Sequence, residues 1–288
     1  MQELGLPRPS HPLIALVNYN DSLIKLPEKG RKISIDFYKI SFKPIFRGQT
    51  KYGQGYYDFE EGGLAFLKPG QIVFTPEDID SYVGFALYIH PDFIRNYPLG
   101  SSINQYGFFS YNVSEALFLS AREKEIITNL FNSIATELDT NTDQFSQDVL
   151  VTQVELLLNF SNRYYNRQFL TRKVVNNNIV NTLDQLLSTK FDQGIGLKND
   201  GLTIPHMCKE LGLSQRYLSD MLKSLTGQNT QQYIQNALME KAKQKLSATN
   251  LSVSEIAYEL GFEHPQSFSK FFKSKTNQSP RQFRASFD

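Results

Sequence analysis

The last 88 residues of this 288-residue chain contain one short pattern twice, and the duplication restricts the folds that the C-terminal part can adopt. Before each turn, Cys208 and Leu211-Gly212-Leu213 recur 49 positions later as Ala257 and Leu260-Gly261-Phe262. After the turn the offset is 50, and the recurring pairs are Leu218 with Phe268, Ser219 with Ser269, Leu222 with Phe272, Lys223 with Lys273, and Gly227 with Asn277. Because equivalent positions keep equivalent chemistry, the pattern indicates a duplicated structural unit.

The first copy has the signals of two short helices joined by a turn. Thr203 is expected to cap a helix that has Pro205 in its first turn, and Gly212 is expected to end that helix. Ser214 then caps the following helix. The apolar side chains expected to face inward on this helix are Tyr217, Leu218, Met221, Leu222 and Leu225. The first copy therefore predicts a helix-turn-helix unit.

The second copy predicts the same unit, and a helix is expected between the two. Either Ser252 or Ser254 caps its first helix, Gly261 ends that helix, and the next helix begins near Pro265. Between the copies, residues 230–246 have apolar side chains at helical spacing. This spacer is about 25 Å long, which approaches the roughly 34 Å of one B-DNA turn once the flanking units are included. The two units are thus spaced to enter successive major grooves on one face of a duplex.

The second helix of each unit leaves polar side chains facing outward. In helix-turn-helix proteins this helix enters the major groove, where arginine suits guanine and glutamine suits adenine. The residues expected to contact bases are Gln215, Arg216, Ser219 and Asp220 in the first unit and Gln266, Ser269 and Lys270 in the second. The residues expected to contact phosphates are Ser214, Lys223, Lys273 and Lys275. One helix-turn-helix pattern often arises by chance, whereas two copies with a helical spacer strongly favour DNA binding.

Charge is divided unevenly between the two halves of the chain. Residues 171–288 hold 15 Lys and Arg against 10 Asp and Glu, a net charge of +5, whereas residues 1–170 hold 15 against 19, a net charge of −4. This asymmetry is expected when one domain meets a polyanion and the other does not. By itself it is weak support, because many soluble domains have a small positive charge.

The chain has the features of a cytoplasmic protein. Residues 1–10 lack the apolar core of a signal peptide, and the longest apolar stretch, residues 82–89, is too short to span a membrane. The single cysteine, Cys208, allows no internal disulfide, which fits a reducing compartment. We therefore expect no membrane association.

The N-terminal half predicts β structure followed by two helices. Residues 12 to about 112 contain β-branched and aromatic runs separated by glycine turns, as in an antiparallel barrel or sandwich. From about Ser120 two amphipathic stripes follow, either to pack on the sheet or to pair with a second subunit. The first stripe is Ile126, Ile127, Leu130, Phe131, Ile134 and Leu138; the second is Val149, Leu150, Val154, Leu157, Leu158, and Tyr164 or Tyr165.

A change in composition marks the expected boundary between domains. Residues 166–178 are polar and poor in apolar side chains, which is typical of a linker, and residues 179–187 begin the first helix of the C-terminal domain. The expected organisation is α+β with two domains. Residues 1–168 form the first, residues 169–184 the linker region and residues 185–288 an all-α DNA-binding domain.

The C-terminal pattern resembles the AraC/XylS family of bacterial transcription regulators over roughly residues 185–287. The signature of that family is matched by residues 253–262, by residues 266–273 and by Ser279-Pro280-Arg281-Gln282-Phe283-Arg284. The resemblance implies base contacts by Arg216, Ser219, Asp220, Gln266, Ser269 and Lys270. It also implies promoter DNA and RNA polymerase as partners, and activation as the usual outcome.

Some positions depart from that family pattern. Asn277 stands where glycine is usual, and asparagine also tolerates the left-handed conformation at a helix end. Ser267 replaces a usual aromatic residue, and Asn236 and Leu238 stand where arginine is frequent. Asp220 would repel phosphate, although it can accept a hydrogen bond from cytosine N4. These departures concern individual contacts and leave the resemblance intact.

The N-terminal half is similar, less tightly, to the cupin-type barrel with which many members of that family bind a small effector and dimerise. The closest local likeness is Leu67-Lys68-Pro69-Gly70-Gln71. Phe37, Tyr57, Phe66 and Phe85 are candidate pocket residues, although each is more readily explained as barrel core. The four histidines, His11, His90, His206 and His264, are scattered, so we expect neither a metal nor another cofactor.

The sequence therefore predicts a homodimeric transcription regulator that responds to a small-molecule effector. The alternative is a regulator without a ligand, controlled by its abundance or by a protein partner. An enzyme fused to a DNA-binding domain is disfavoured, because the chain lacks a clustered metal-ligand set, a phosphate-binding glycine loop and a nucleophile with its base. Cys208 is expected on the buried face of a helix.

Overall fold

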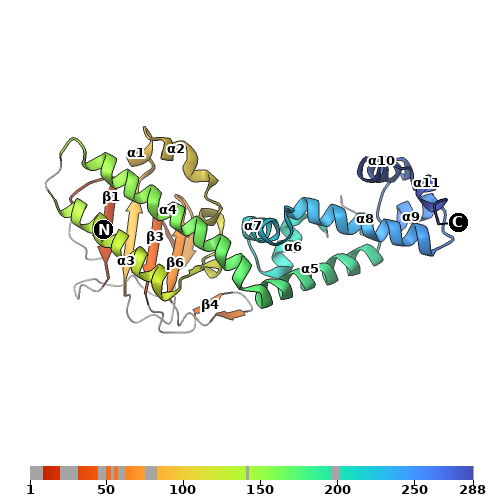
Figure 1. Ribbon diagram of the computed structural model, residues 1–288, viewed down its shortest axis with the longest axis horizontal. Coiled ribbons are helices and arrows are strands. Elements are labelled where there is room, and N and C mark those ends of the chain that lie inside the picture. Colours follow the sequence, from red (N-terminus) through yellow and green to blue (C-terminus); the bar gives the residue numbers. More distant parts are fainter. Residues whose placement is uncertain are drawn as a thin grey trace. The chain divides into compact units, whose positions relative to one another are not determined.

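The computed structural model describes residues 9–19, 32–44, 50–52, 55–57, 62–74, 83–140, 143–195 and 202–287. The chain forms two compact units, Met1–Gln168 and Phe169–Asp288 (Figure 1). The first unit contains the strands and two long helices, and the second is helical. This two-part α+β organisation confirms the predicted fold class in outline. In the part of the chain that is described, no helix is long and apolar enough to cross a bilayer.

The N-terminal unit is built on a five-stranded antiparallel sheet. Its strand order is β1 (Ile14–Asn18), β8 (Phe85–Ile89), β3 (Tyr38–Lys43), β6 (Gly63–Leu67) and β9 (Leu117–Phe118). Two smaller antiparallel pairs are β2 (Lys32–Ser34) with β7 (Ile72–Phe74) and β4 (Thr50–Tyr52) with β5 (Gly55–Tyr57). The predicted antiparallel β region is thus confirmed. Among the described strands, no pairing closes these sheets into a barrel.

The two faces of the five-stranded sheet differ in composition. Along β3, Tyr38, Ile40 and Phe42 are buried, whereas the alternate side chains are half-buried. The buried face is covered by α3 (Ala121–Asp139) and α4 (Ser146–Thr171), which lie across it in Figure 1. The Phe42 ring stacks on Phe131 of α3 with 5.7 Å between ring centroids. Burying such a ring contributes about 1.5–3 kcal/mol, so this face forms the main core of the unit.

Residues 91–115 form short helices where the sequence predicted β structure. These are α1 (Pro91–Ile94), α2 (Pro98–Ser102) and the 3₁₀ turns η2 (Ile103–Gln105), η3 (Gly107–Ser110) and η4 (Val113–Glu115). The prediction of strands up to about residue 112 was therefore wrong. Pro91 and Pro98 each occupy the first turn of a helix, where the missing N–H costs nothing. The His90 side chain caps α1 by accepting a hydrogen bond from the Asp92 N–H at 3.2 Å.

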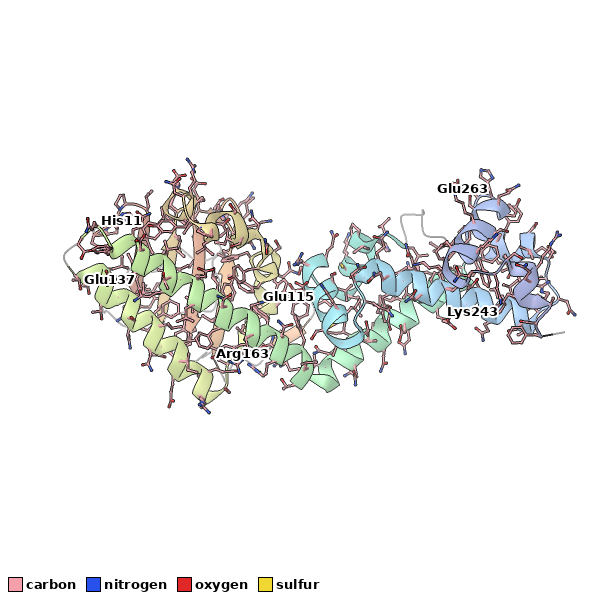
Figure 2. The ribbon with its side chains drawn as sticks, turned by 45° about the horizontal axis from the view of Figure 1, so that its top comes forward. His11, Glu115, Glu137, Arg163, Lys243 and Glu263 are labelled. Carbon is pink, nitrogen blue, oxygen red and sulfur yellow. The ribbon has the colours of Figure 1, made fainter. Side chains whose placement is uncertain are left out.

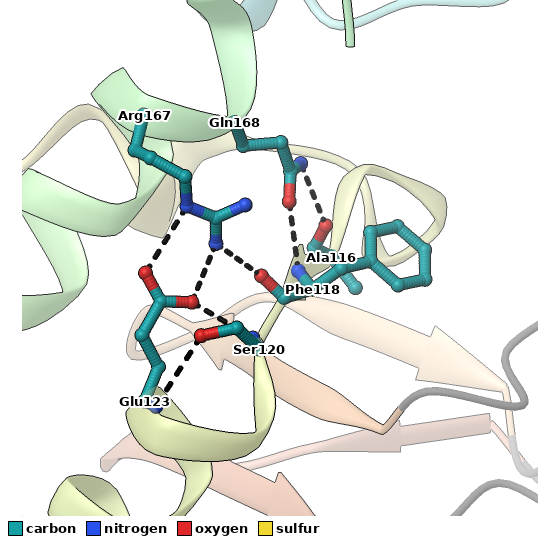
Figure 3. A network of polar contacts seen from close by, with 6 residues as sticks. All are labelled: Ala116, Phe118, Ser120, Glu123, Arg167 and Gln168. Carbon is teal, nitrogen blue, oxygen red and sulfur yellow. Dashed lines mark hydrogen bonds and ion pairs between the residues drawn. The ribbon is translucent and has the colours of Figure 1, made fainter. Parts of the chain in front are cut away.

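A polar network fixes the end of α4 to the start of α3 (Figure 3). The Arg167 guanidinium donates to both carboxylate oxygens of Glu123, at 3.1 and 2.8 Å, and to the Phe118 carbonyl at 2.8 Å. Buried Gln168 accepts from the Phe118 N–H at 2.8 Å and donates to the Ala116 carbonyl at 3.2 Å. These contacts satisfy the backbone of β9, which pairs with β6 through only two residues.

The expected linker is largely helical. α4 continues to Thr171 and α5 (Lys173–Asp192) begins two residues later. Asn176 is buried, and its side chain donates to the Phe169 carbonyl at 2.6 Å, so a polar residue is used to hold the helical junction. The polar composition of this segment therefore does not mark an irregular loop. The domain boundaries given by the sequence stay a prediction.

The C-terminal unit contains two helix-turn-helix pairs joined by a helix, as the sequence predicted. The first pair is α6 (Ile204–Leu211) and α7 (Gln215–Thr226), and the second is α9 (Val253–Glu259) and α10 (Pro265–Thr276). α8 (Thr230–Ala248) connects the pairs and packs on α5, and α11 (Pro280–Arg284) follows α10. Each pair buries its own apolar residues, among them Met221 and Leu222 in α7 and Phe268 and Phe272 in α10.

Candidate nucleic-acid interface

The two turns have the same backbone hydrogen bonds at equivalent positions. In the first, Gly212 is left-handed with φ 69°, and the Leu213 N–H donates to the Cys208 carbonyl at 2.9 Å. In the second, Gly261 has φ 75°, and the Phe262 N–H donates to the Ala257 carbonyl at 2.9 Å. Donor and acceptor are both displaced by 49 residues, which matches the sequence offset. The duplication is therefore conserved in backbone geometry.

Helix caps fix where the helices of each helix-turn-helix pair begin and end. Ser214 caps α7, with its hydroxyl accepting from the Tyr217 N–H at 3.2 Å. Ser252 caps α9 in a reciprocal pair with Glu255, which decides between the two serines that the sequence left open. Asn277 ends α10 in the left-handed conformation with φ 59°, equivalent to Gly227 at the end of α7. The expectation that asparagine tolerates the left-handed conformation at this helix end is confirmed.

The second helix of each helix-turn-helix pair, called the recognition helix, presents the predicted polar side chains outward. On α7, Gln215, Arg216 and Lys223 are exposed and Ser219 and Asp220 are partly exposed. On α10, Gln266, Lys270, Lys273 and Lys275 are exposed and Ser269 is partly exposed. Ser214 is partly buried because it caps α7. All these residues lie where DNA can reach them, and the contacts themselves stay a prediction.

Arg216 and Asp220 form an ion pair on the outer face of α7. The Arg216 Nε donates to the Asp220 carboxylate at 2.9 Å, with the Arg216 side chain 50% exposed. Such an exposed pair contributes only about 0.3–0.5 kcal/mol to the helix. Its consequence is orientation, because it holds one edge of the guanidinium and partly offsets the charge of Asp220. The spacing of four residues would have allowed its prediction from the sequence.

α8 is attached to its neighbours along its length, which fixes the spacing between the two helix-turn-helix pairs. Near its start, the Tyr233 hydroxyl donates to Asp184 of α5 at 2.8 Å, and burial together with this carboxylate raises the pKa of Tyr233. Near its end, Lys245 forms an ion pair with Glu259 of α9 at 2.6 Å, and Arg284 of α11 donates to the Leu246 carbonyl at 3.1 Å. At 1.5 Å per residue, its 19 residues span about 28 Å.

Basic side chains gather towards the end of α10. Lys273 and Lys275 lie in its last turn, where the partial negative charge of the helix end favours cations. Figure 2 shows Glu263 in the preceding turn, at the edge of the unit, and Lys243 on α8. The polar side chains of the recognition helices, flanked by these lysines, have the chemistry of a DNA-binding surface.

The candidate pocket residues of the N-terminal unit do not all lie on one face of the sheet. Phe66 and Phe85 lie on the face covered by α3 and α4. The Phe66 ring packs on Phe108 with 4.3 Å between ring centroids, and the Phe85 ring stacks on Phe131 with 5.4 Å between ring centroids. Both therefore belong to the core, which was the alternative for them. Phe37 is half-buried with its ring edge against His90 at 5.1 Å. The Tyr57 side chain lies outside the described residues.

Neither unit presents a metal site among its described residues, where no three His, Cys, Asp or Glu side chains are grouped to hold an ion. Cys208 is buried on α6, as expected. His206 forms a pair with Glu210 at 2.6 Å, and Lys190 contacts the same carboxylate at 3.0 Å. These two contacts lower the pKa of Glu210 and connect α5 to α6.

Comparison with known proteins supports this interface. A family model described as a helix-turn-helix domain matches residues 207–286. Over 86 residues the chain is 37% identical to the raffinose operon transcriptional regulatory protein RafR of Pediococcus pentosaceus, covering 30% of this chain and 31% of that protein. Over 143 residues it is 30% identical to the HTH-type transcriptional activator RhaS of Escherichia coli, covering 50% and 47%. The chain thus spans less than half the length of these relatives.

Among solved structures, the chain is similar to an AraC-type transcriptional regulator from Chromobacterium violaceum. The two are 21% identical with a TM-score of 0.31, and the likeness covers 38% of this chain and 94% of that chain.

Proposed function

This chain is a member of the AraC family of helix-turn-helix transcription regulators, and we propose that it reads an asymmetric promoter site with α7 and α10. The observation that carries the proposal is the pair of equivalent turns, each followed by a helix with an exposed polar face. Regulation rather than catalysis is the activity of this family. In that role the protein acts on the chromosome in the cytoplasm and contacts RNA polymerase, most often as an activator.

We assign base reading to the outer faces of the recognition helices. Arg216, oriented by Asp220, donates to guanine O6 and N7, and Gln266 pairs with adenine. The remaining carboxylate oxygen of Asp220 accepts from cytosine N4, and Ser219, Ser269, Gln215 and Lys270 complete the contacts. Ser214, Lys223, Lys273 and Lys275 bind phosphates and set the position of the helices on the duplex.

A binding measurement with the full chain tests this proposal. The protein is expected to bind a selected promoter fragment at nanomolar concentration and to lose affinity steeply as salt is added. A random duplex of equal length serves as the control. Equal affinity for both duplexes would contradict sequence-specific regulation.

For the N-terminal unit we propose a cupin-like barrel that binds a small-molecule effector and dimerises. Support for dimerisation comes from α4, whose Val149 and Leu156 side chains are 39% and 44% exposed although apolar. They lie seven residues apart and so share one helix face, as expected of a helix-pairing surface. Light scattering tests this: Leu156→Lys is expected to give monomers, while the control Asn162→Lys leaves dimers. Wild-type monomers would contradict the proposal.

The second candidate is a regulator without an effector, controlled by its abundance or by a protein partner. It shares every DNA contact with the first proposal, so only ligand binding separates the two. A thermal-shift screen of sugars, aromatic compounds and lipids distinguishes them, because a hit favours the effector and the absence of any hit favours the second candidate.

A further inference from the structure

The face of the five-stranded sheet that is turned away from α3 and α4 has an unusual set of side chains. On β3 it presents Lys39, Ser41 and Lys43, which alternate with the core residues. Strand register places Tyr88 and Leu67 opposite Lys39, Ala86 and Ala65 opposite Ser41, and Gly63 opposite Lys43. β1 adds Ala15 beside Tyr88 and Val17 beside Ala86. We call these residues, with Tyr19, the lysine face.

Two ammonium groups share this face. Lys39 and Lys43 stand on one strand with a single outward position between them, and both are half-buried. Burial, reinforced by repulsion from Lys39, lowers the pKa of Lys43 to about 8. The protein therefore holds Lys43 in surroundings that disfavour its positive charge, at a cost to folding. Such a perturbed group marks a candidate functional site when further polar groups lie beside it.

Two phenol groups complete the cluster. The Tyr19 and Tyr88 hydroxyls lie 3.4 Å apart, and the Lys39 ammonium lies over the Tyr88 ring at 5.3 Å from its centroid. Burial raises the pKa of Tyr19, and Lys39 opposes part of that rise. The Tyr19 phenol thus stays protonated at neutral pH. The Tyr88 hydroxyl, the Tyr19 hydroxyl and the Lys39 ammonium thus lie together on this face, and Lys43 stands two outward positions farther along β3.

The rest of the lysine face is lined by small and apolar side chains. Ala15, Ala65 and Ala86 lie between the polar groups, and Ala15 and Ala86 are buried. Val17 and Leu67 provide apolar surface beside them. Cationic and hydroxyl donors next to small and apolar residues suit a ligand with one anionic end and an apolar body.

We propose that the lysine face binds an organic carboxylate, with Lys39 and Lys43 facing its anionic group and Tyr19 or Tyr88 donating to it. The identification of this carboxylate as the effector rests on the proposed function. The site differs from the aromatic pocket expected from the sequence, because Phe66 and Phe85 project from the opposite face of the sheet.

Calorimetry on the full chain at pH 7 tests the site with charged probes and neutral partners of the same shape. Benzoate is compared with benzamide, hexanoate with hexanamide, and phenyl phosphate serves as the other anion. At least one carboxylate is expected to bind, and its amide to bind about tenfold more weakly or not at all. Absence of binding by both carboxylates, equal binding of the amides, or binding of phenyl phosphate alone would overturn the proposal.

Matched lysine substitutions locate the binding. Lys39→Gln and Lys43→Gln are each expected to weaken carboxylate binding about tenfold, which corresponds to about 1.4 kcal/mol. Lys68→Gln removes an exposed lysine from the same unit and should leave the affinity unchanged. Circular dichroism melting checks that each variant is folded. A loss with Lys68→Gln equal to that with Lys43→Gln would overturn the site.

DNA binding, measured separately, keeps this proposal distinct from the proposed function. Promoter-specific binding without carboxylate binding would reject the site and leave the regulator. Lysine-dependent carboxylate binding without specific DNA binding would support the site and reject the regulator. A carboxylate that binds and also changes promoter affinity supports both.

Discussion

The two units of this chain differ in how far apart in sequence their determining contacts lie. In the C-terminal unit, each helix pair is defined by caps and turn glycines within about 25 residues, and the pattern then repeats. In the N-terminal unit, β1 pairs with β8, and β3 pairs with both β6 and β8. Which side chains lie on which face of the sheet therefore depends on pairing between distant segments. The proposed functions are divided in the same way, because the C-terminal unit carries the DNA-reading surface and the N-terminal unit carries the proposed ligand site.

The largest expected effect separates the two cores. Phe272→Ala and Phe131→Ala each remove a fully buried ring, and each should cost about 3–5 kcal/mol in its own unit. If the cores are independent, Phe272→Ala abolishes DNA binding and leaves carboxylate binding, while Phe131→Ala does the reverse. Thermal unfolding with both ligand assays checks this. Loss of both activities in both variants would show one shared core.

Glycine substitution gives a sharper comparison between the units. Gly84 has φ 105°, and an added Cβ would collide with the Phe42 carbonyl, so Gly84→Ala should cost about 2–4 kcal/mol. Gly212 has φ 69° with open space around an added Cβ, so Gly212→Ala should cost only about 1–2 kcal/mol of backbone strain. Denaturant melts measure both. A larger cost at Gly212 would contradict the account of its turn.

The dependence of stability on pH tests the lysine face. Lys43 has a folded-state pKa of about 8 against an ordinary value of 10.5, so the unfolded chain binds more protons between these values. Stability contributed by this group therefore rises as pH increases from about 8 to 10.5. Lys43→Met should remove that rise and stabilise the protein at pH 7 by on the order of 1–2 kcal/mol. Identical pH profiles for variant and wild type would be evidence against a buried Lys43.

The smallest expected effect concerns phosphate contacts. Lys273→Ala should weaken binding to all duplexes alike and reduce the salt slope by about one, because one phosphate contact is lost. The control is Lys209→Ala, which removes an exposed lysine of α6 outside the recognition helices. Titrations at several salt concentrations measure the slope. A change in sequence preference, rather than in slope, would move Lys273 into the base-reading group.

Sequence reasoning was most accurate where a recognisable local pattern is repeated. Caps at Ser214 and turns at Gly212, Gly261 and Asn277 are set by neighbouring residues, so the helix-turn-helix units could be predicted. Two other predictions failed although the deciding residues lie close together in the sequence. Residues 91–102 are helical because of proline positions inside a β-rich region, and buried Asn176 supports a helix in a segment that resembled a linker.

For the candidate sites, the limit was set by contacts between distant segments. Outward residues of α7 and α10 follow from helical periodicity alone. Which face of β3 packs on the helices depends on its register with β6 and β8, and a shift by one residue exchanges Lys39 and Lys43 with Ile40 and Phe42. For this reason the sequence predicts aromatic pocket candidates, whereas the lysine face depends on the strand register that the structure shows.

The most direct test of the central claim is the sequence preference of the two recognition helices, measured by selecting binding sites from random duplexes. Arg216→Ala and Gln266→Ala should each relax the preference at a different position, and the two positions should lie about 10 base pairs apart, one turn of the duplex. Each substitution should cost about 1–3 kcal/mol at its own position. Relaxation at the same position, or no change in preference with either variant, would contradict a chain that reads DNA with two helices.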